Sequence, residues 1–422
     1  MNPFDLKPCS LESTLLDWTG MRPISYDKWG DPYTRCRTIL MNGTEFEAVW
    51  FGHQFSRNCP NNDVRRCLAL IRRSEQNQQK LLSVLKPVDE TVLEHTIGYE
   101  QLAVDLTAHL AKKEPDKYVK KALDFALLED FDHLYRYANF LDMETGVHAE
   151  NLVGKYTEIM PARPTVSHYR HPFDSIRYSI NNKTASPITR LCTGIITAAE
   201  QQTMNYYMNV CALYPNDRGR FLYQEIGMVE EQHVTHYGSL LDPCATWLEN
   251  LVMHQFTEAY LYWSNYETES DPRVKVIWEK LFEMEVSHLH AASEMLKKYE
   301  NKDPVSVVGD ANFPSPLVLE SNIPYVRDVL AKSVQMTACR EEYECVNSLP
   351  DNFDFFRYQE LINHDLNTVQ SHTIIEDYIR QNGMDYRFEI CPNPIPALTV
   401  RTRDDTSLGR VKGVSNACNL DI

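Results

Sequence analysis

The chain has 422 residues, of which 43% are hydrophobic and 24% charged, so it can bury a substantial core and is expected to divide into two or three structural units. Its formal net charge of -17 disfavours nucleic-acid binding, which needs clustered Lys and Arg side chains. No apolar run approaches the roughly 18 residues of a membrane span, and the N-terminal residues lack a secretory-signal pattern. We therefore expect a cytoplasmic protein that binds neither nucleic acid nor a membrane.

Several familiar motifs are missing from the sequence. The eleven cysteines include no CxxC pair, which removes the zinc-ribbon and rubredoxin interpretations. The sequence also has no GxGxxG, GxxxxGK[ST], GxSxG or HExxH, so the simplest nucleotide-binding, serine-hydrolase and zinc-protease interpretations fail as well. No organic cofactor site is predicted.

Helical periodicity dominates the chain from residue 62 onward, whereas residues 1 to about 60 lack it and are predicted to be irregular. Proline and capping residues at the breaks indicate where helices begin and end. The predicted helices cover residues 63–86, 88–112, 116–142, 188–213, 217–241, 245–268 and 272–299. The last six form three tight antiparallel hairpins.

The connections divide the chain into three predicted domains. Residues 143–187 are long enough to run the length of a helical bundle, and we interpret them as a crossover. After the linker 301–322, one more helical hairpin is predicted over 323–348 and 354–382, followed by a loop-like tail. The resulting domains are an irregular segment with one helix (1–86), a helical bundle with the crossover (87–300), and a C-terminal hairpin with its tail (301–422).

The first two hairpins repeat one sequence pattern at an offset of 100 residues. The matching pairs are Glu100/Glu200, Asp130/Glu230, His133/His233, Tyr137/Tyr237, Leu141/Leu241 and Asp142/Asp242. The third hairpin resembles this unit through Glu285 and His288 in its second helix. The three hairpins therefore look like variants of one structural unit.

Each hairpin carries one Glu in its first helix and an acid-x-x-His motif in its second. The three sets are Glu100 with Asp130 and His133, Glu200 with Glu230 and His233, and Glu258 with Glu285 and His288. Members of a set lie at similar distances from the hairpin turn, so they share one layer. An acid and a His three residues apart project from the same helical face and can bind the same ion.

The number of acid-x-x-His motifs alone does not indicate a metal site, because about two are expected by chance in this composition. The residues that surround each acid are better evidence. One helical turn from each acid the residues are mostly apolar, as Ile97 and Val104 are near Glu100. Carboxylates on such a stripe are costly unless a cation, a proton or hydrogen bonds neutralise them. Several in one layer predict a metal centre. The alternative is a set of buried ion pairs and hydrogen-bonded histidines, with Arg136, Arg177 or Arg190 as candidate partners.

The pattern resembles the ferritin-like di-metal carboxylate superfamily, in which two helices supply one Glu each and two supply Glu-x-x-His. The resemblance covers about residues 88–300 and implies an all-α fold, a ferritin-like antiparallel helical bundle with additional hairpins and irregular terminal segments. The resemblance also implies a bound pair of metal ions, which are two iron ions, two manganese ions, or one ion of each metal. In the roles that it implies, Glu100 and Glu200 are terminal or bridging ligands, Asp130 and Glu230 bridge the ions, and His133 and His233 each bind one. Asp130 departs from the usual Glu.

Three arrangements of the hairpins remain open. The crossover 143–187 favours pairing 88–142 with 188–241, because the family's bundle joins its halves by a long connection. Pairing 188–241 with 245–299 instead would use two unmodified Glu and Glu-x-x-His sets. A third arrangement combines 245–299 with the C-terminal hairpin through Glu344, Glu360 and His364, which match the pattern poorly.

Mixed carboxylate and imidazole ligands suit iron or manganese. The expected function is a di-iron oxidase, oxygenase or peroxidase that uses O2 or H2O2, an unidentified small-molecule substrate and a separate electron donor. A homo-oligomer is compatible with this function. The alternatives are an iron-storage or ferroxidase-like protein and a non-enzymatic helical scaffold with buried ion pairs.

Overall fold

The structure is a computed structural model that describes residues 1–365, 368–389 and 394–395, and it is mostly helical. The long helices are α1 (Pro32–Asn58), α2 (Asn62–Ser83), α3 (Val92–Lys113), α4 (Lys117–Thr145), α6 (Pro187–Leu213), α7 (Asp217–Gly238), α8 (Trp247–Thr268) and α9 (Pro272–Glu300). The shorter helices are α5 (Glu150–Val153), α10 (Pro304–Val308), α11 (Ile323–Ser333), α12 (Asp354–Asn363), α13 (Gln370–Asn382) and α14 (Tyr386–Glu389). Within the described residues, no helix is long and apolar enough to cross a membrane.

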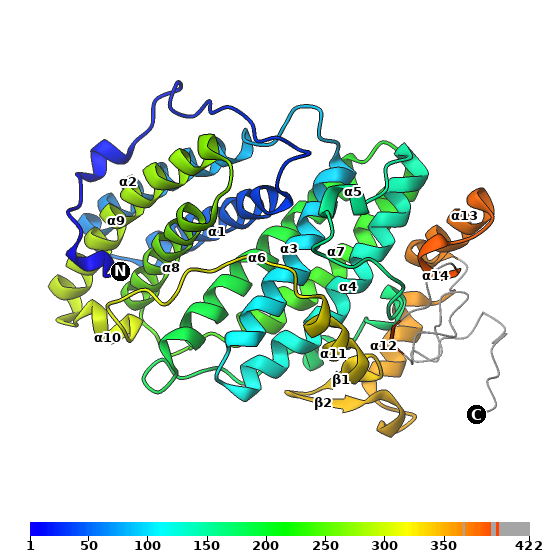
Figure 1. The fold of residues 1–422 in the computed structure, drawn as a ribbon. Coiled ribbons are helices and arrows are strands. Elements are labelled where there is room, and N and C mark those ends of the chain that lie inside the picture. The colour runs from blue at the N-terminus through cyan, green and yellow to red at the C-terminus, as the bar shows by residue number, and fades with distance from the viewer. Residues whose placement is uncertain (366–367, 390–393, 396–422) are drawn as a thin grey trace.

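The long helices form two groups of four (Figure 1). The inner bundle consists of α3, α4, α6 and α7, in which the hairpins α3–α4 and α6–α7 pack on each other. The outer bundle consists of α1, α2, α8 and α9, and its two hairpins flank the inner bundle in the sequence. Helix α1 joins the bundles because it packs on α3 and α6 as well as on α2 and α8.

Short polar side chains begin the helices where the sequence predicts breaks. Asp116, Asn216 and Asp271 each accept backbone N–H groups of the first turn of α4, α7 and α9, respectively. Thr91 and Glu94 form a capping box at the start of α3. Each cap satisfies N–H groups that have no partner inside the helix. These tight turns set the two helices of each hairpin antiparallel.

The connection between α4 and α6 runs along the inner bundle, as the crossover interpretation predicts. It contains α5, which packs on α3, and a short 3-10 turn at Thr165–Ser167 that contacts α4 and α7. Its side chains include buried Arg163, His168 and Arg170. The crossover therefore contributes charged groups to the interior in addition to joining the two hairpins.

Two predictions of secondary structure are wrong. Residues 1–60 are not irregular throughout, because 32–58 form the long helix α1. Residues 323–348 are α-helical only in α11. They continue as the antiparallel strands β1 (Met336–Cys339) and β2 (Glu342–Cys345) and end in a 3-10 turn at Val346–Ser348. A two-residue turn joins the strands, with Arg340 at a positive φ of 53°. Ala338 and Tyr343 are paired in the ladder and face the protein interior.

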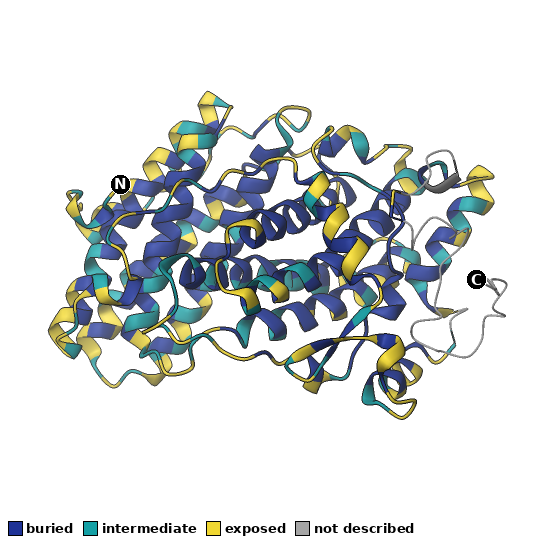
Figure 2. Cartoon of the chain, turned by 60° about the horizontal axis from the view of Figure 1, so that its bottom comes forward, coloured by how far each residue is buried: buried dark blue, intermediate teal, exposed yellow. Residues whose placement is uncertain are grey.

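The C-terminal elements pack on the inner bundle, where α11 lies on α4, and α13 lies on α4 and α7. The predicted pairing of α8–α9 with the C-terminal hairpin is therefore wrong, since α8 and α9 pack on the other helices of the outer bundle and on α10. Most of the predicted loop-like tail, including residues 396–422, lies outside the described residues. Figure 2 shows buried residues along the centres of both bundles and exposed residues on their outer faces.

Candidate metal centre

Six of the nine predicted ligands come together in the middle of the inner bundle, and we name them the first cluster. Its members are Glu100 from α3, Asp130 and His133 from α4, Glu200 from α6, and Glu230 and His233 from α7. Each helix of the bundle therefore contributes one carboxylate, and the second helix of each hairpin also contributes an imidazole. Because each acid and His are three residues apart, both point to the bundle axis.

All six side chains are at most 1% exposed, and many of their polar atoms have no hydrogen-bond partner among the described residues. Both carboxylate oxygens of Asp130 and of Glu200 are in this state, as are one oxygen of Glu100 and one of Glu230. Such buried, unpartnered atoms are unusual, because desolvation costs free energy that a hydrogen bond normally offsets. A cation in the cluster would accept these lone pairs, and the residues present therefore fit a metal centre.

The ligand atoms fall into two groups that share one residue. In the first group, Asp130, Glu200, Glu230 and His233 each offer an atom, and these atoms all lie within 4.8 Å of one another. In the second group, Glu100, His133 and Glu230 do the same. Glu230 belongs to both groups, as a carboxylate that bridges two ions must. Asp130 belongs only to the first group, although the family resemblance implies a bridging role for it.

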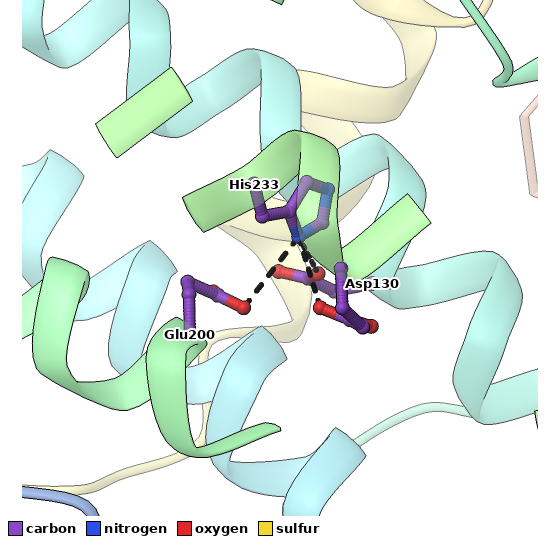
Figure 3. A group of neighbouring side chains, drawn as sticks. Asp130, Glu200 and His233 are labelled. Carbon is purple, nitrogen blue, oxygen red and sulfur yellow. Dashed lines mark ion pairs between the residues drawn. The ribbon is translucent and has the colours of Figure 1, made fainter. Parts of the chain in front are cut away.

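His233 contacts all three carboxylates of its group through Nδ1 (Figure 3). This atom lies 3.3 Å from Asp130 Oδ1, 3.5 Å from Glu200 Oε2 and 3.2 Å from Glu230 Oε2. In the other group, His133 Nδ1 lies 2.8 Å from Glu230 Oε1. The two imidazole rings are 6.2 Å apart between centroids. The two groups therefore lie side by side, with one imidazole on each.

Burial and mutual repulsion disfavour four ionised carboxylates in the first cluster. Burial and the neighbouring carboxylates raise the pKa of Glu100 and Asp130 well above the usual values. Burial also raises the pKa of Glu200 to about 7, although His233 opposes this. For Glu230, burial is outweighed by His233 and His133, which lower its pKa to about 2. Two divalent cations would balance the charge of four carboxylates and remove this conflict.

The opposite nitrogen of His233 is held by a buried ion pair that the sequence analysis does not predict. His233 Nε2 lies 2.7 Å from Glu129 Oε2, and Arg170 Nη1 lies 2.6 Å from Glu129 Oε1. Although burial raises the pKa of Glu129, Arg170 and His233 lower it well below its usual value. A carboxylate on the far nitrogen fixes the ring of a metal-binding His. By contrast, His133 Nε2 has no hydrogen-bond partner among the described residues.

Three buried tyrosines surround the first cluster. Tyr207 donates a hydrogen bond to Glu100 Oε1. Tyr137 and Tyr237 lie one helical turn after His133 and His233, at matching positions of the repeat, and their hydroxyl groups have no partner within the described chain. Both side chains are fully buried. Two hydroxyl groups are thus available beside the cluster to donate hydrogen bonds to a bound molecule.

The arginines considered as alternative partners for the cluster are engaged elsewhere. Arg136 forms an ion pair with Asp132 at 3.1 Å, and Arg177 stacks over Tyr343. Arg190 donates to the backbone carbonyl of Val307. Among the described residues, none of the four carboxylates of the first cluster forms an ion pair with Lys or Arg. These arginines are therefore not the partners of the cluster, and its carboxylates Asp130, Glu200 and Glu230 pair instead with His133 and His233.

The remaining three predicted ligands lie in the outer bundle, away from the first cluster. We name the second cluster by its five members, which are Glu45 from α1, Glu75 from α2, Glu258 from α8, and Glu285 and His288 from α9. The sequence pattern does not identify Glu45 and Glu75 as candidate ligands. One signal was present, since these residues are 30 apart, like Glu100 and Asp130. However, Gln78 stands where the motif has His.

Comparisons of the chain with protein-family models, with curated proteins and with solved structures give no match.

Proposed function

We propose that the first cluster holds two iron or manganese ions and that the protein is an oxidase, oxygenase or peroxidase. One observation carries the proposal: buried donor atoms without partners form two groups that share Glu230. The donor set of four carboxylates and two imidazoles suits these metals. A pair of such ions supplies redox chemistry, because together they exchange two electrons with O2 or H2O2.

The residues around the ions support this chemistry in distinct ways. Glu230 would be shared by the two ions, and Glu129 with Arg170 fixes the ring of His233. The apolar interior of the bundle excludes water, which strengthens electrostatic interactions there. The hydroxyl groups of Tyr137 and Tyr237, which have no hydrogen-bond partner among the described residues, would be available to hold or donate a proton beside the cluster. Electrons come from a separate donor protein.

Metal content per chain tests the proposal. Wild-type protein and Glu230→Ala are purified without chelator, loaded anaerobically with Fe2+ and compared by elemental analysis. Because both ion positions use Glu230, the variant should bind about two ions fewer per chain. Glu231→Gln changes an exposed neighbour on α7 and is the matched control, with wild-type content expected.

Oxygen consumption by the loaded protein then distinguishes catalysis from storage. Repeated consumption of O2 or H2O2 with an external reductant supports an enzyme, whereas one stoichiometric oxidation followed by iron retention supports a storage protein. Equal iron content in wild type and Glu230→Ala contradicts the proposed metal centre.

A further inference from the structure

The outer bundle repeats the arrangement of the inner bundle at the second cluster. Each of its four helices contributes one carboxylate, and His288 follows Glu285 by three residues. All five side chains of the second cluster are at most 1% exposed. Glu45 and Glu75 are 30 residues apart, as are Glu100 and Asp130. The hairpin α1–α2 is therefore a fourth copy of the repeated unit, and Gln78 takes the position of the histidine.

The charge of the second cluster is poorly balanced by the protein. Four buried carboxyl groups face a single imidazole, that of His288, whose Nδ1 lies 2.9 Å from Glu285 Oε1. In the described part of the chain, none of the four forms an ion pair with Lys or Arg. A buried layer of this kind needs protons or a cation.

Two glutamine side chains point into the second cluster and leave their oxygens without partners. Gln78 Nε2 donates to Glu285 Oε1 at 2.7 Å, and Gln255 Nε2 donates to Glu75 Oε1 at 2.9 Å and to Glu258 Oε2 at 2.7 Å. Both glutamines are fully buried, yet neither Oε1 atom has a hydrogen-bond partner among the described residues. The same is true of Glu45 Oε2, Glu258 Oε1 and Glu285 Oε2.

The unpartnered oxygens of Gln78 and of the glutamates are donors of the kind that hard divalent cations prefer. Carboxylate and amide oxygens suit Mg2+, Ca2+ and Mn2+, whereas an additional imidazole favours the later transition metals. The second cluster has one imidazole, whereas the first cluster has two. Gln78 provides an amide at the motif position where the inner bundle has a histidine. The difference at this position predicts different ion preferences for the two bundles.

We propose that the second cluster, together with Gln78, binds a divalent cation that prefers oxygen ligands, such as Mn2+. The site is separate from the first cluster and does not depend on the reaction proposed there. Among the described residues, only the first cluster brings at least three Asp, Glu, His or Cys ligand atoms within 4.8 Å of one another. Gln255 instead bridges Glu75 and Glu258 by hydrogen bonds. Binding of the ion therefore displaces this bridge.

Mn2+ binding to the full-length, chelator-treated chain tests the proposal by electron paramagnetic resonance and elemental analysis. Glu230→Ala removes the shared ligand of the first cluster and should still bind about one Mn2+ per chain. Adding Glu45→Gln and Glu258→Gln to that variant should abolish the remaining binding. The Glu→Gln changes preserve side-chain shape, and circular dichroism verifies folding.

A second variant keeps the proposal testable if the combined variant fails to fold. Gln255→Ala releases Glu75 and Glu258 from their hydrogen bonds, so in the Glu230→Ala background it should tighten Mn2+ binding by about tenfold or more. A folded Glu230→Ala protein that binds no Mn2+ contradicts the proposal. Unchanged Mn2+ binding after both Glu→Gln changes contradicts it as well. Neither outcome bears on the iron content of the first cluster, which is measured separately.

Discussion

His233 lies between two kinds of carboxylate: its Nδ1 faces the first cluster, and its Nε2 lies 2.7 Å from Glu129 Oε2. Because Glu129 also pairs with Arg170, the ring is held by a charged group that is itself fixed. The imidazole of His233 is therefore oriented by a partner on its far nitrogen. Among the described residues, the Nε2 atom of His133 has no such partner.

The first prediction concerns Glu129. Glu129→Gln should weaken binding at the His233 position by about 10- to 100-fold, the usual effect of losing such an outer partner, and leave the His133 position largely intact. Titration of the apo-protein with Fe2+ under anaerobic conditions measures the two dissociation constants, and in this variant it should resolve one tight site and one weak site. Glu231→Gln is the control on the surface. Two equally tight sites in Glu129→Gln would contradict a positioning role.

The two histidines of the first cluster provide the second prediction. His133→Ala and His233→Ala should each bind about one iron fewer per chain than wild type, because each imidazole belongs to a different group. His236→Gln changes a fully buried histidine of the same helix outside the cluster and should keep the wild-type content. If one of the two Ala variants lost no iron, the corresponding group would not be an ion position.

The third prediction concerns the two unpartnered hydroxyl groups. Tyr137→Phe and Tyr237→Phe should retain iron and thermal stability, since the hydroxyl groups make no hydrogen bond within the described part of the chain that would be lost. Turnover should fall by about 100-fold or more if a hydroxyl group delivers a proton in the slow step. Tyr223→Phe, whose hydroxyl lies 2.6 Å from Thr96 Oγ1, is the matched control. Full turnover in both test variants would exclude the tyrosines from the reaction.

The fourth prediction concerns pH and Asp105, a buried residue of α3 outside both clusters. Burial raises its pKa to about 7, although Thr157 and Tyr33 donate hydrogen bonds to it. The folded state therefore binds the proton more tightly than the unfolded state, and this stability is lost as pH rises from about 4 through 7.

Asp105→Asn removes this titration and keeps an oxygen to accept the hydrogen bonds. The variant should gain stability relative to wild type above pH 7, on the order of a few kcal/mol, because one pKa unit corresponds to about 1.4 kcal/mol. Chemical denaturation of both proteins at pH 5 and pH 8 measures the difference. Asp328→Asn, on an exposed position of α11, should show no such pH-dependent gain.

The sequence predicts the hairpins well because local chemistry determines their ends. The capping residues Asp116, Asn216 and Asp271 immediately precede α4, α7 and α9, where the breaks are predicted. The spacing of acids and histidines also predicts which residues of the inner bundle share a layer. Both inferences depend only on residues within one helix or one tight turn.

The missed features depend on contacts between distant segments. Helix α1 is surrounded by α2, α3, α6 and α8, so most of its side chains are buried and it shows no polar face. The periodicity that identifies a surface helix is therefore weak. The strands β1 and β2 are short, and a pair of this length is stable only when it packs on other elements. Glu129 escaped prediction because its partner Arg170 comes from the crossover.

The order of the helices along the chain has a consequence for synthesis. The α1–α2 hairpin emerges first, and α8–α9 emerges only after all four helices of the inner bundle. The inner bundle can therefore assemble while the α1–α2 hairpin still exposes the apolar face and the two glutamates that it will later bury. A nascent chain stalled after α7 would hold a complete first cluster beside half of the second. The α8–α9 hairpin thus completes the outer bundle last. Destabilising substitutions in α8 or α9 are expected to cause aggregation before they affect the inner bundle.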